Sequence, residues 1–338
     1  MDCMDCMDCY EITSPGTLVR TTRPTPRPGP LEVAVRLRAA SLNYRDLLVL
    51  KGRYPNIRHP LVPLSDGAGE VCETGEGVTR FKVGDRVAAI FNQAWIQGPP
   101  PATPRALGGD IDGMLAGTVV VPESGLVRLP DSLSFEEGAT LPCAAVTAWN
   151  ALFESARLRP GQTVLVQGTG GVSLFALQFA RMAGAFVILL SRSAEKIAHV
   201  LPLGVDRAID TGRFPDWERE VLDLTGGRGV DHVVEVGGAE TLPRSLAATR
   251  HLGHVAVIGV LSGGEVRLPI FALLSRQIRL SGIYVGNRDH FEAMNAAIAT
   301  NGLHPHIGRL FPFSEAPEAF RTLESGEFTG KLVISFED

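Results

Sequence analysis

The sequence predicts an α/β protein with two domains, a small β-barrel and a doubly wound parallel sheet. Short strand-like runs separated by Gly, Pro and Asp fill the first third of the chain, as in an all-β barrel. From about Ser124 to Gly282, strand-like and helix-like runs alternate, which is typical of βαβ units. The length of 338 residues also exceeds what one ordinary core holds.

The barrel strands are expected where alternating or apolar runs are bounded by turn residues. Proline-rich residues 24–30 predict an extended loop, and residues 97–109 predict a long loop of the kind that often serves as a lid. The expected barrel strands are 31–39, 69–74, 86–91 and 118–121.

The parallel-sheet domain is expected to include an early helix, because Ser134 and Glu137 form a capping box. Six strand-like runs follow, each separated from the next by a helical or loop segment. The expected parallel strands are 164–166, 186–190, 207–210, 231–236, 254–260 and 277–282.

The C-terminal part is expected to return to the barrel. It holds an amphipathic helix over 291–298 and a strand over 331–335. We therefore expect the barrel domain at 1–124 and 288–338, and the parallel-sheet domain at 125–287.

A glycine-rich turn follows the first parallel strand and opens a helix. In this setting, backbone N–H groups and the helix N-terminus point at a pyrophosphate. Ser173 stands where the third glycine of this fingerprint is expected, and serine is small enough to keep the helix close to the strand. A turn that binds no nucleotide is the alternative. The turn residues are Gly168, Thr169, Gly170, Gly171 and Val172.

The end of the next strand predicts which dinucleotide is bound. NAD-specific proteins usually carry Asp or Glu there for the ribose 2′-OH. This chain has Ser191, Arg192 and Ser193, followed by Lys196. A guanidinium and hydroxyls suit a 2′-phosphate, so the sequence predicts NADP(H). For Lys196 a solvated helix start is the alternative.

Charge and hydropathy exclude several classes of function. The net charge of −5 and the lack of a basic run argue against nucleic acid. No apolar segment approaches the about 20 residues that span a membrane, and no signal peptide is visible. We expect a cytoplasmic protein.

The five cysteines do not predict a metal site. The spacing of Cys3, Cys6 and Cys9 could indicate a metal or cluster site, but no fourth ligand lies nearby. Because these cysteines belong to a repeated Met-Asp-Cys triplet at the chain end, we interpret the segment as a redundant, frayed start. Cys72 and Cys143 are expected to be buried thiols.

From Tyr10 onward the chain resembles the medium-chain dehydrogenase/reductase superfamily. The resemblance implies a GroES-like barrel domain, a Rossmann domain and hydride transfer in the cleft between them. The matching motifs lie at 40–46, 83–87, 141–149, 160–161, 168–173, 203–206 and 330–333.

The residues that differ from those of the zinc enzymes indicate which branch of the superfamily this chain resembles. The resemblance places Asn43 where those enzymes have a zinc-binding cysteine, and Arg45 where they have the hydroxyl that relays the alcohol proton. Leu64-Ser65-Asp66 stands in place of their zinc-binding Gly-His-Glu motif. Only Cys143 matches a ligand, and one thiol cannot hold catalytic zinc. The chain is therefore similar to the metal-free quinone oxidoreductases and enoyl reductases, in which NADPH reduces a quinone or an α,β-unsaturated carbonyl.

The resemblance implies four candidate catalytic residues. Asn43 and Tyr44 would lie near the nicotinamide, and Asn43 would bind the ribose or a substrate oxygen unless it only starts the next helix. Tyr54 would donate a proton or serve as a packed aromatic. Arg45 would steer the substrate or pair with Asp46.

The resemblance also implies further cofactor contacts. Thr147 would lie beside the nicotinamide unless its hydroxyl bonds back to a helix carbonyl. Lys331 would reach the cofactor or cap the last strand. The remaining candidates are Gly237, Gly259, Val260, Leu261, Tyr284, Val285 and Gly286.

Two further functions remain open: a zinc-free alcohol or aldehyde reductase, and an NADPH-binding protein with little turnover, as in crystallin relatives. The expected partner is a small carbonyl or quinone. Because strand 277–282 would lie at a sheet edge, we also expect a homodimer.

Overall fold

A computed structural model of the chain describes residues 6–336 and divides into two units. Unit 1 runs to Val146 and resumes at Gly286, and unit 2 is Thr147–Val285. The first boundary lies later in the chain than the expected 124/125. The reason is that strand β7 (Leu126–Arg128) pairs with β5 (Arg86–Ala89) and so belongs to the sheet of unit 1.

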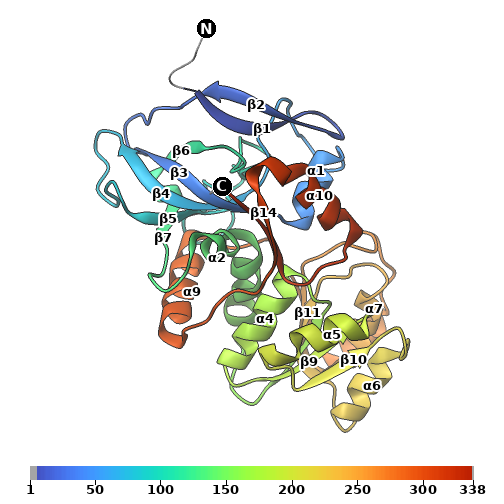
Figure 1. Cartoon of the computed structure of the whole chain (residues 1–338). Helices are drawn as coiled ribbons and strands as arrows, with labels where there is room; N and C mark the ends of the chain where they lie inside the picture. Colours follow the sequence, from blue (N-terminus) through green and yellow to red (C-terminus); the bar gives the residue numbers. More distant parts are fainter. Residues whose placement is uncertain (1–5, 337–338) are drawn as a thin grey trace. The chain divides into compact units, whose positions relative to one another are not determined.

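The main sheet of unit 1 has the strand order β14-β15-β3-β4-β5-β7, with β6 paired to β3. Figure 1 labels these strands except β15. Its strand pairs are antiparallel except for β14 and β15. The pairing of β15 with β3 returns the C-terminal strand to the barrel, as predicted. The other strands are β3 (Glu32–Ser41), β4 (Asp66–Thr74), β6 (Thr118–Pro122), β14 (Ile307–Pro312) and β15 (Lys331–Ser335).

The N-terminal hairpin was not anticipated. β1 (Cys6–Ser14) pairs with β2 (Thr17–Pro24), and Cys9 is fully buried in the core of unit 1. Burial raises the pKa of Cys9 to about 11, so this core side chain stays a protonated thiol at neutral pH. The interpretation of the triplet repeat as a frayed start is therefore wrong from Cys6 onward, while Cys3 lies outside the described residues. Cys9, Cys72 and Cys143 form no disulfide, but Cys72 and Cys143 are only partly buried, so the expectation of two buried thiols is wrong in that respect.

Short helices complete unit 1. Ser134 caps α2 (Phe135–Ala139) through the predicted capping box, and a π-helical turn follows at Leu141–Ala145. The remaining helices are α1 (Tyr44–Leu50), α9 (Arg288–Asn301) and α10 (Ala316–Ser325).

Unit 2 is a six-stranded parallel sheet in the order β10-β9-β8-β11-β12-β13. This is the Rossmann order, which reverses between β8 and β11. All six predicted strands are present, although β12 begins earlier than expected. They are β8 (Thr163–Gln167), β9 (Phe186–Ser191), β10 (Arg207–Asp210), β11 (Val230–Glu235), β12 (Thr249–Val257) and β13 (Arg279–Gly282).

Helices and turns of unit 2 connect these strands (Figure 1). The first helical stretch, α3 (Val146–Trp149) with a π-helical turn at Asn150–Ser155, begins at the unit boundary. The others are α4 (Gly171–Met182), α5 (Ala194–Val200), α6 (Trp217–Leu224), α7 (Leu242–Ala248) and α8 (Ile270–Arg276).

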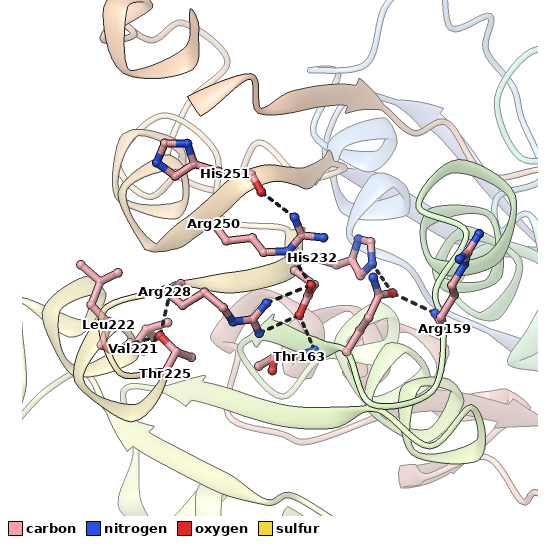
Figure 2. Close-up of polar contacts among 12 residues, drawn as sticks. Arg159, Thr163, Val221, Leu222, Thr225, Arg228, His232, Arg250 and His251 are labelled. Carbon is pink, nitrogen blue, oxygen red and sulfur yellow. Dashed lines mark hydrogen bonds and ion pairs between the residues drawn. The ribbon is translucent and has the colours of Figure 1, made fainter. Parts of the chain in front are cut away.

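A network of ion pairs and hydrogen bonds links the amino ends of β8 and β11 (Figure 2). Asp231 accepts hydrogen bonds from Arg228, from Arg250 and from the Thr163 N–H. Burial opposes ionisation, but these donors hold the pKa of Asp231 at about 2. This end of the sheet is thus fixed by structural charges, and the carboxyl ends are left for a ligand.

Across residues 6–336, every helix is too short or too polar to cross a lipid bilayer.

Candidate functional site

The predicted glycine turn joins β8 to α4. Gly168 has φ +74°, a conformation that L side chains rarely adopt. Ser173 donates a hydrogen bond from Oγ to the Gln167 carbonyl oxygen (2.6 Å), so a serine at the third position still ties the helix to the strand. An added Cβ on Gly168 or Gly170 would meet open space, and none of the described side chains caps the N-terminus of α4. The Gly168 N–H donates to the Leu190 carbonyl (2.7 Å), so the N–H groups that begin α4 are the ones available to a phosphate.

The end of β9 carries the proposed 2′-phosphate residues. Arg192 is exposed, whereas Ser191 is buried and its hydroxyl lies 3.3 Å from the Ser193 N–H. Ser193 caps α5 by accepting from the Lys196 N–H (3.2 Å). The Ser193 hydroxyl thus has a structural role, and Arg192 is the side chain best placed to meet a ligand.

The loop after β11 is held by a carboxylate that the sequence analysis missed. Glu235 is fully buried and accepts from the N–H groups of Gly237 (2.8 Å) and Gly238 (3.0 Å). Gln167, which ends β8, donates to the other oxygen of Glu235 (2.7 Å). Two polar residues that end two adjacent buried strands were the signal available in the sequence. They fix the Gly237 loop beside the glycine turn.

The other candidate loops of unit 2 follow β12 and β13. Gly259 lies against the backbone of Val236, where an added Cβ would be 2.0 Å from the carbonyl oxygen. Val260 and Leu261 are more than half exposed. The loop therefore passes the carboxyl end of β11 closely and presents apolar side chains to solvent.

Residues near the unit boundaries have mixed environments. Thr147, at the start of unit 2, is buried, and Tyr284 is 46% exposed. Val285 has φ +49°, and its carbonyl accepts from Asn150 Nδ2 (2.7 Å). Gly286 belongs to unit 1, where an added Cβ would be 2.7 Å from Val146 Cγ1. Close packing at this position therefore requires glycine.

In unit 1, Lys331 and Asn43 are brought together with Asp66. Lys331 Nζ donates to Asn43 Oδ1 and to the Leu42 carbonyl, each at 2.6 Å, and lies 3.8 Å from Asp66 Oδ2. The Lys331 side chain is 3% exposed. Its ammonium is therefore buried among groups of unit 1, and the sequence analysis did not predict this placement.

Asp66 links the positions that resemble zinc ligands. It accepts from Ser65 Oγ (2.7 Å) and from the Cys143 N–H (3.3 Å). Burial raises the pKa of Asp66, while Lys331 and hydrogen bonds from Asn43, Ser65 and Cys143 oppose that rise. The Asp66 carboxylate thus lies at the centre of a buried polar cluster, which also contains Asn43, Ser65, Cys143 and Lys331.

This cluster does not fit a catalytic zinc ion. Asn43 offers an amide oxygen that Lys331 already engages, and Ser65 offers a hydroxyl where an imidazole or thiolate is needed. Nowhere in residues 6–336 do three His, Cys, Asp or Glu side chains gather as a metal site. We therefore assign no step to a metal.

Arg45 lies among two aromatic rings and the start of α1. Its guanidinium is 4.8 Å from the centroid of Tyr54 and 4.9 Å from that of Phe91. Its Nη1 donates to the Leu107 carbonyl (2.9 Å) and is 3.8 Å from Asp46 Oδ1. The predicted pairing with Asp46 is present, and with these contacts Arg45 fastens α1 to the 97–109 loop.

The two aromatic candidates differ in exposure. Tyr44 is 42% exposed at the start of α1, and Tyr54 is half-buried beside Arg45. The Asn43 N–H donates to the Asp46 carboxylate (2.8 Å), so Asn43 also begins α1, as its structural alternative predicted.

The chain matches two known domain families. Residues 29–131 match the alcohol dehydrogenase GroES-like domain, and residues 171–300 match the zinc-binding dehydrogenase domain. Over 318 residues the chain is 44% identical to a zinc-type alcohol dehydrogenase-like protein of Schizosaccharomyces pombe, with 91% of this chain and 92% of the relative covered. The chain belongs to the medium-chain dehydrogenase/reductase superfamily, with a GroES-like domain and a Rossmann domain.

Solved structures give the same assignment. A Sinorhizobium meliloti 1021 protein, provisionally assigned as an alcohol dehydrogenase, is 42% identical with a TM-score of 0.94, covering 98% of this chain and 99% of that one. The 2-octenoyl-CoA carboxylase reductase CinF, in complex with NADP and 2-octenoyl-CoA, is 25% identical with a TM-score of 0.88, covering 98% and 88%. This protein is therefore an alcohol dehydrogenase-like oxidoreductase of a family that binds nicotinamide cofactors.

Proposed function

We propose that the protein is an NADPH-dependent oxidoreductase that transfers hydride, without a metal, to a quinone or an α,β-unsaturated carbonyl. The observation that carries the cofactor assignment is the end of β9. An exposed guanidinium, Arg192, follows Ser191 where NAD-specific proteins place a carboxylate. A carboxylate would repel a 2′-phosphate, whereas a guanidinium can bind it through two hydrogen bonds.

The rest of unit 2 fits the same cofactor. The open turn before α4 offers the N–H groups of the helix N-terminus to the pyrophosphate, and the Glu235 network holds the neighbouring Gly237 loop in place. When bound, NADPH supplies the hydride. The chain's part is to bind and orient the cofactor and the acceptor.

The reaction class follows from the buried cluster of unit 1. Simple alcohol oxidation develops charge on the oxygen of the reacting carbon, which zinc would stabilise. Asn43, Ser65 and Cys143 do not form such a site. In a quinone or an enone, charge develops on an oxygen remote from the attacked carbon, where one or two hydrogen-bond donors suffice. CinF, which is solved with NADP and an unsaturated thioester, supports this class of substrate.

A second candidate is a metal-free alcohol or aldehyde oxidoreductase. The provisional assignment of the Sinorhizobium relative favours it. It would require Tyr54 or Arg45 to supply the stabilisation that zinc gives elsewhere. This candidate predicts turnover of simple carbonyls.

We also propose that the protein is a homodimer. β13 lies at the edge of the sheet in unit 2 and exposes ladder groups that a second copy can pair with. The neighbouring helix α8 is apolar on its exposed face, where Phe271 is 82% and Leu274 is 66% exposed. Light scattering of the purified protein and of Phe271→Asp tests this: the variant should shift toward monomer.

The experiment for function is a cofactor and substrate survey after metal analysis. NADPH and NADH consumption would be followed against quinones, enones, enoyl thioesters, aldehydes and alcohols. We expect turnover of quinones or unsaturated carbonyls with NADPH preferred and no stoichiometric zinc. Turnover of aldehydes alone would favour the second candidate. NADPH binding without any turnover would indicate a crystallin-like role, and preference for NADH would overturn the cofactor assignment.

A further inference from the structure

The segment that follows β13 holds one residue in a strained conformation. Val285 has φ +49°, which is rare for a β-branched residue because its side chain crowds the main chain there, and it is only 6% exposed. Such a conformation persists only where the surrounding structure holds it, and it often marks a ligand-binding site. Here the Ile283 N–H donates to the Val257 carbonyl (3.0 Å), and Asn150 Nδ2 donates to the Val285 carbonyl (2.7 Å). Asn150 therefore fixes the main chain at the strained residue.

Asn150 itself lies at a second uncommon backbone feature. It begins the π-helical turn Asn150–Ser155, a form that is frequent at functional sites. At the other end of this turn, the Ser155 carbonyl accepts from Arg279 Nη2 (2.6 Å), and Arg279 begins β13. The turn therefore lies along β13 and runs in the opposite direction, with Asn150 toward the carboxyl end of the strand. The Asn150–Val285 hydrogen bond thus joins two unusual backbone conformations at the edge of the sheet where ligands of this fold bind.

The strand order of unit 2 shows which half of a dinucleotide would lie near this segment. A dinucleotide binds across the point where the strand order reverses, which is between β8 and β11. The glycine turn after β8 would take the pyrophosphate, and Ser191 and Arg192 at the end of β9 lie on the adenosine side. The nicotinamide half then extends the other way, over β11, β12 and β13, and residues 283–285 follow the last of these strands.

We propose that Asn150 is a positioning residue for the nicotinamide half of the cofactor. Its amide N–H holds residues 283–285 in the strained conformation in which they bound the nicotinamide site, so Asn150 acts through Val285. Tyr284, which is 46% exposed, precedes Val285 and is held in place with it. The inference rests on the cofactor part of the proposed function, and the experiment separates the failure of one from the failure of the other.

The first experiment compares the binding of NADPH with that of adenosine 2′,5′-bisphosphate, which is the adenosine half of NADPH without the nicotinamide. The variants are Asn150→Ala and Asn150→Leu, of which the second keeps the size of the side chain but has no donor. We expect both variants to raise the NADPH Kd by about three- to tenfold, the range that one lost hydrogen bond supports. The Kd for the bisphosphate should stay at its wild-type value, because this ligand does not reach residues 283–285.

A spectroscopic measurement reports on the nicotinamide ring directly. The reduced ring of NADPH is fluorescent, and its emission changes when the ring enters a protein site. At saturating NADPH, both Asn150 variants should give a smaller emission change than the wild type, since the ring is held less firmly. Arg279→Ala is the matched control, because it removes the hydrogen bond at the other end of the same turn. We expect this control to lose stability in denaturant while keeping the wild-type ratio of the two Kd values and the wild-type emission.

Several results would overturn the role of Asn150. Equal losses for NADPH and the bisphosphate would indicate a general loss of structure in unit 2. An NADPH-selective loss in Arg279→Ala as large as in Asn150→Ala would show that any anchor of the turn suffices, and wild-type Kd and emission in the Asn150 variants would show that the contact does not matter.

The wild-type protein tests the cofactor part separately. If it binds NADH more tightly than NADPH, the proposed cofactor is wrong, and the same comparison with NADH and ADP-ribose decides the role of Asn150. If it binds neither dinucleotide, both proposals are overturned.

Discussion

The Arg45 guanidinium lies 4.8 Å from the centre of the Tyr54 ring, and this contact separates two roles of the tyrosine. The ring stabilises Arg45, while only the hydroxyl can serve as a proton donor. Tyr54→Phe keeps the ring and should therefore lower kcat on an enone while changing the melting temperature less than Tyr54→Leu does. Tyr54→Leu should also destabilise the protein by about 1 kcal/mol, the usual size of a cation–π contact. Thermal unfolding and steady-state kinetics measure the two effects, and unchanged kcat in Tyr54→Phe excludes the donor role.

Arg192 should discriminate between the two cofactors. Arg192→Ala is expected to raise the KM for NADPH by tenfold or more and to leave the KM for NADH nearly unchanged, because only NADPH carries the 2′-phosphate. Arg207→Ala is a suitable control, since Arg207 is an exposed arginine that begins β10 in the same sheet. Equal changes for both cofactors would contradict the assignment of Arg192.

Gln167 should matter for cofactor binding without touching the cofactor. Gln167→Leu removes one donor from the buried Glu235 and one acceptor from the Gly237 N–H. Leaving a buried carboxylate short of a donor costs about 1–3 kcal/mol. We expect lower stability in denaturant and a weaker NADPH Kd, with Gln167→Glu worse still because two carboxylates would meet. A wild-type Kd in Gln167→Leu would show that the Gly237 loop does not depend on this network.

Two buried histidines should make the stability of unit 2 sensitive to acid. Burial lowers the pKa of His232 to about 4 and that of His254 to about 3, with Arg279 adding to both shifts. An unfolded chain binds these protons near pH 6.5. The folded pKa lies below the unfolded one, so the stability contribution is complete above pH 6.5 and is lost as the pH falls toward 4.

The size of this effect can be measured by comparison with His254→Gln, which cannot take up a proton. Each histidine should cost up to about 1.4 kcal/mol of unfolding free energy per pH unit below 6.5. The wild type should therefore lose stability between pH 6.5 and 4.5 more steeply than the variant. Because both proteins share every carboxylate, parallel pH profiles would mean that His254 is protonated in the folded state.

Some of the site was visible in the sequence because it depends on local geometry. The turn at Gly168 follows directly from a strand, a left-handed glycine and a helix start, and all three are encoded within a few residues. Ser193 was predicted to help bind the 2′-phosphate, and in the structure its hydroxyl caps α5. The competition between a cap and a ligand contact is decided by side-chain direction, which a sequence pattern does not specify.

The sequence by itself determined the two fold classes and the parallel strands, because hydrophobic period and turn residues are local properties. Tertiary structure alone decided that Lys331 reaches Asn43, that Gln167 reaches Glu235, and that Cys9 is part of a core strand. These contacts join residues that are far apart in the chain or on neighbouring strands. Their formation depends on strand register and burial, which are set by the packing of the whole unit.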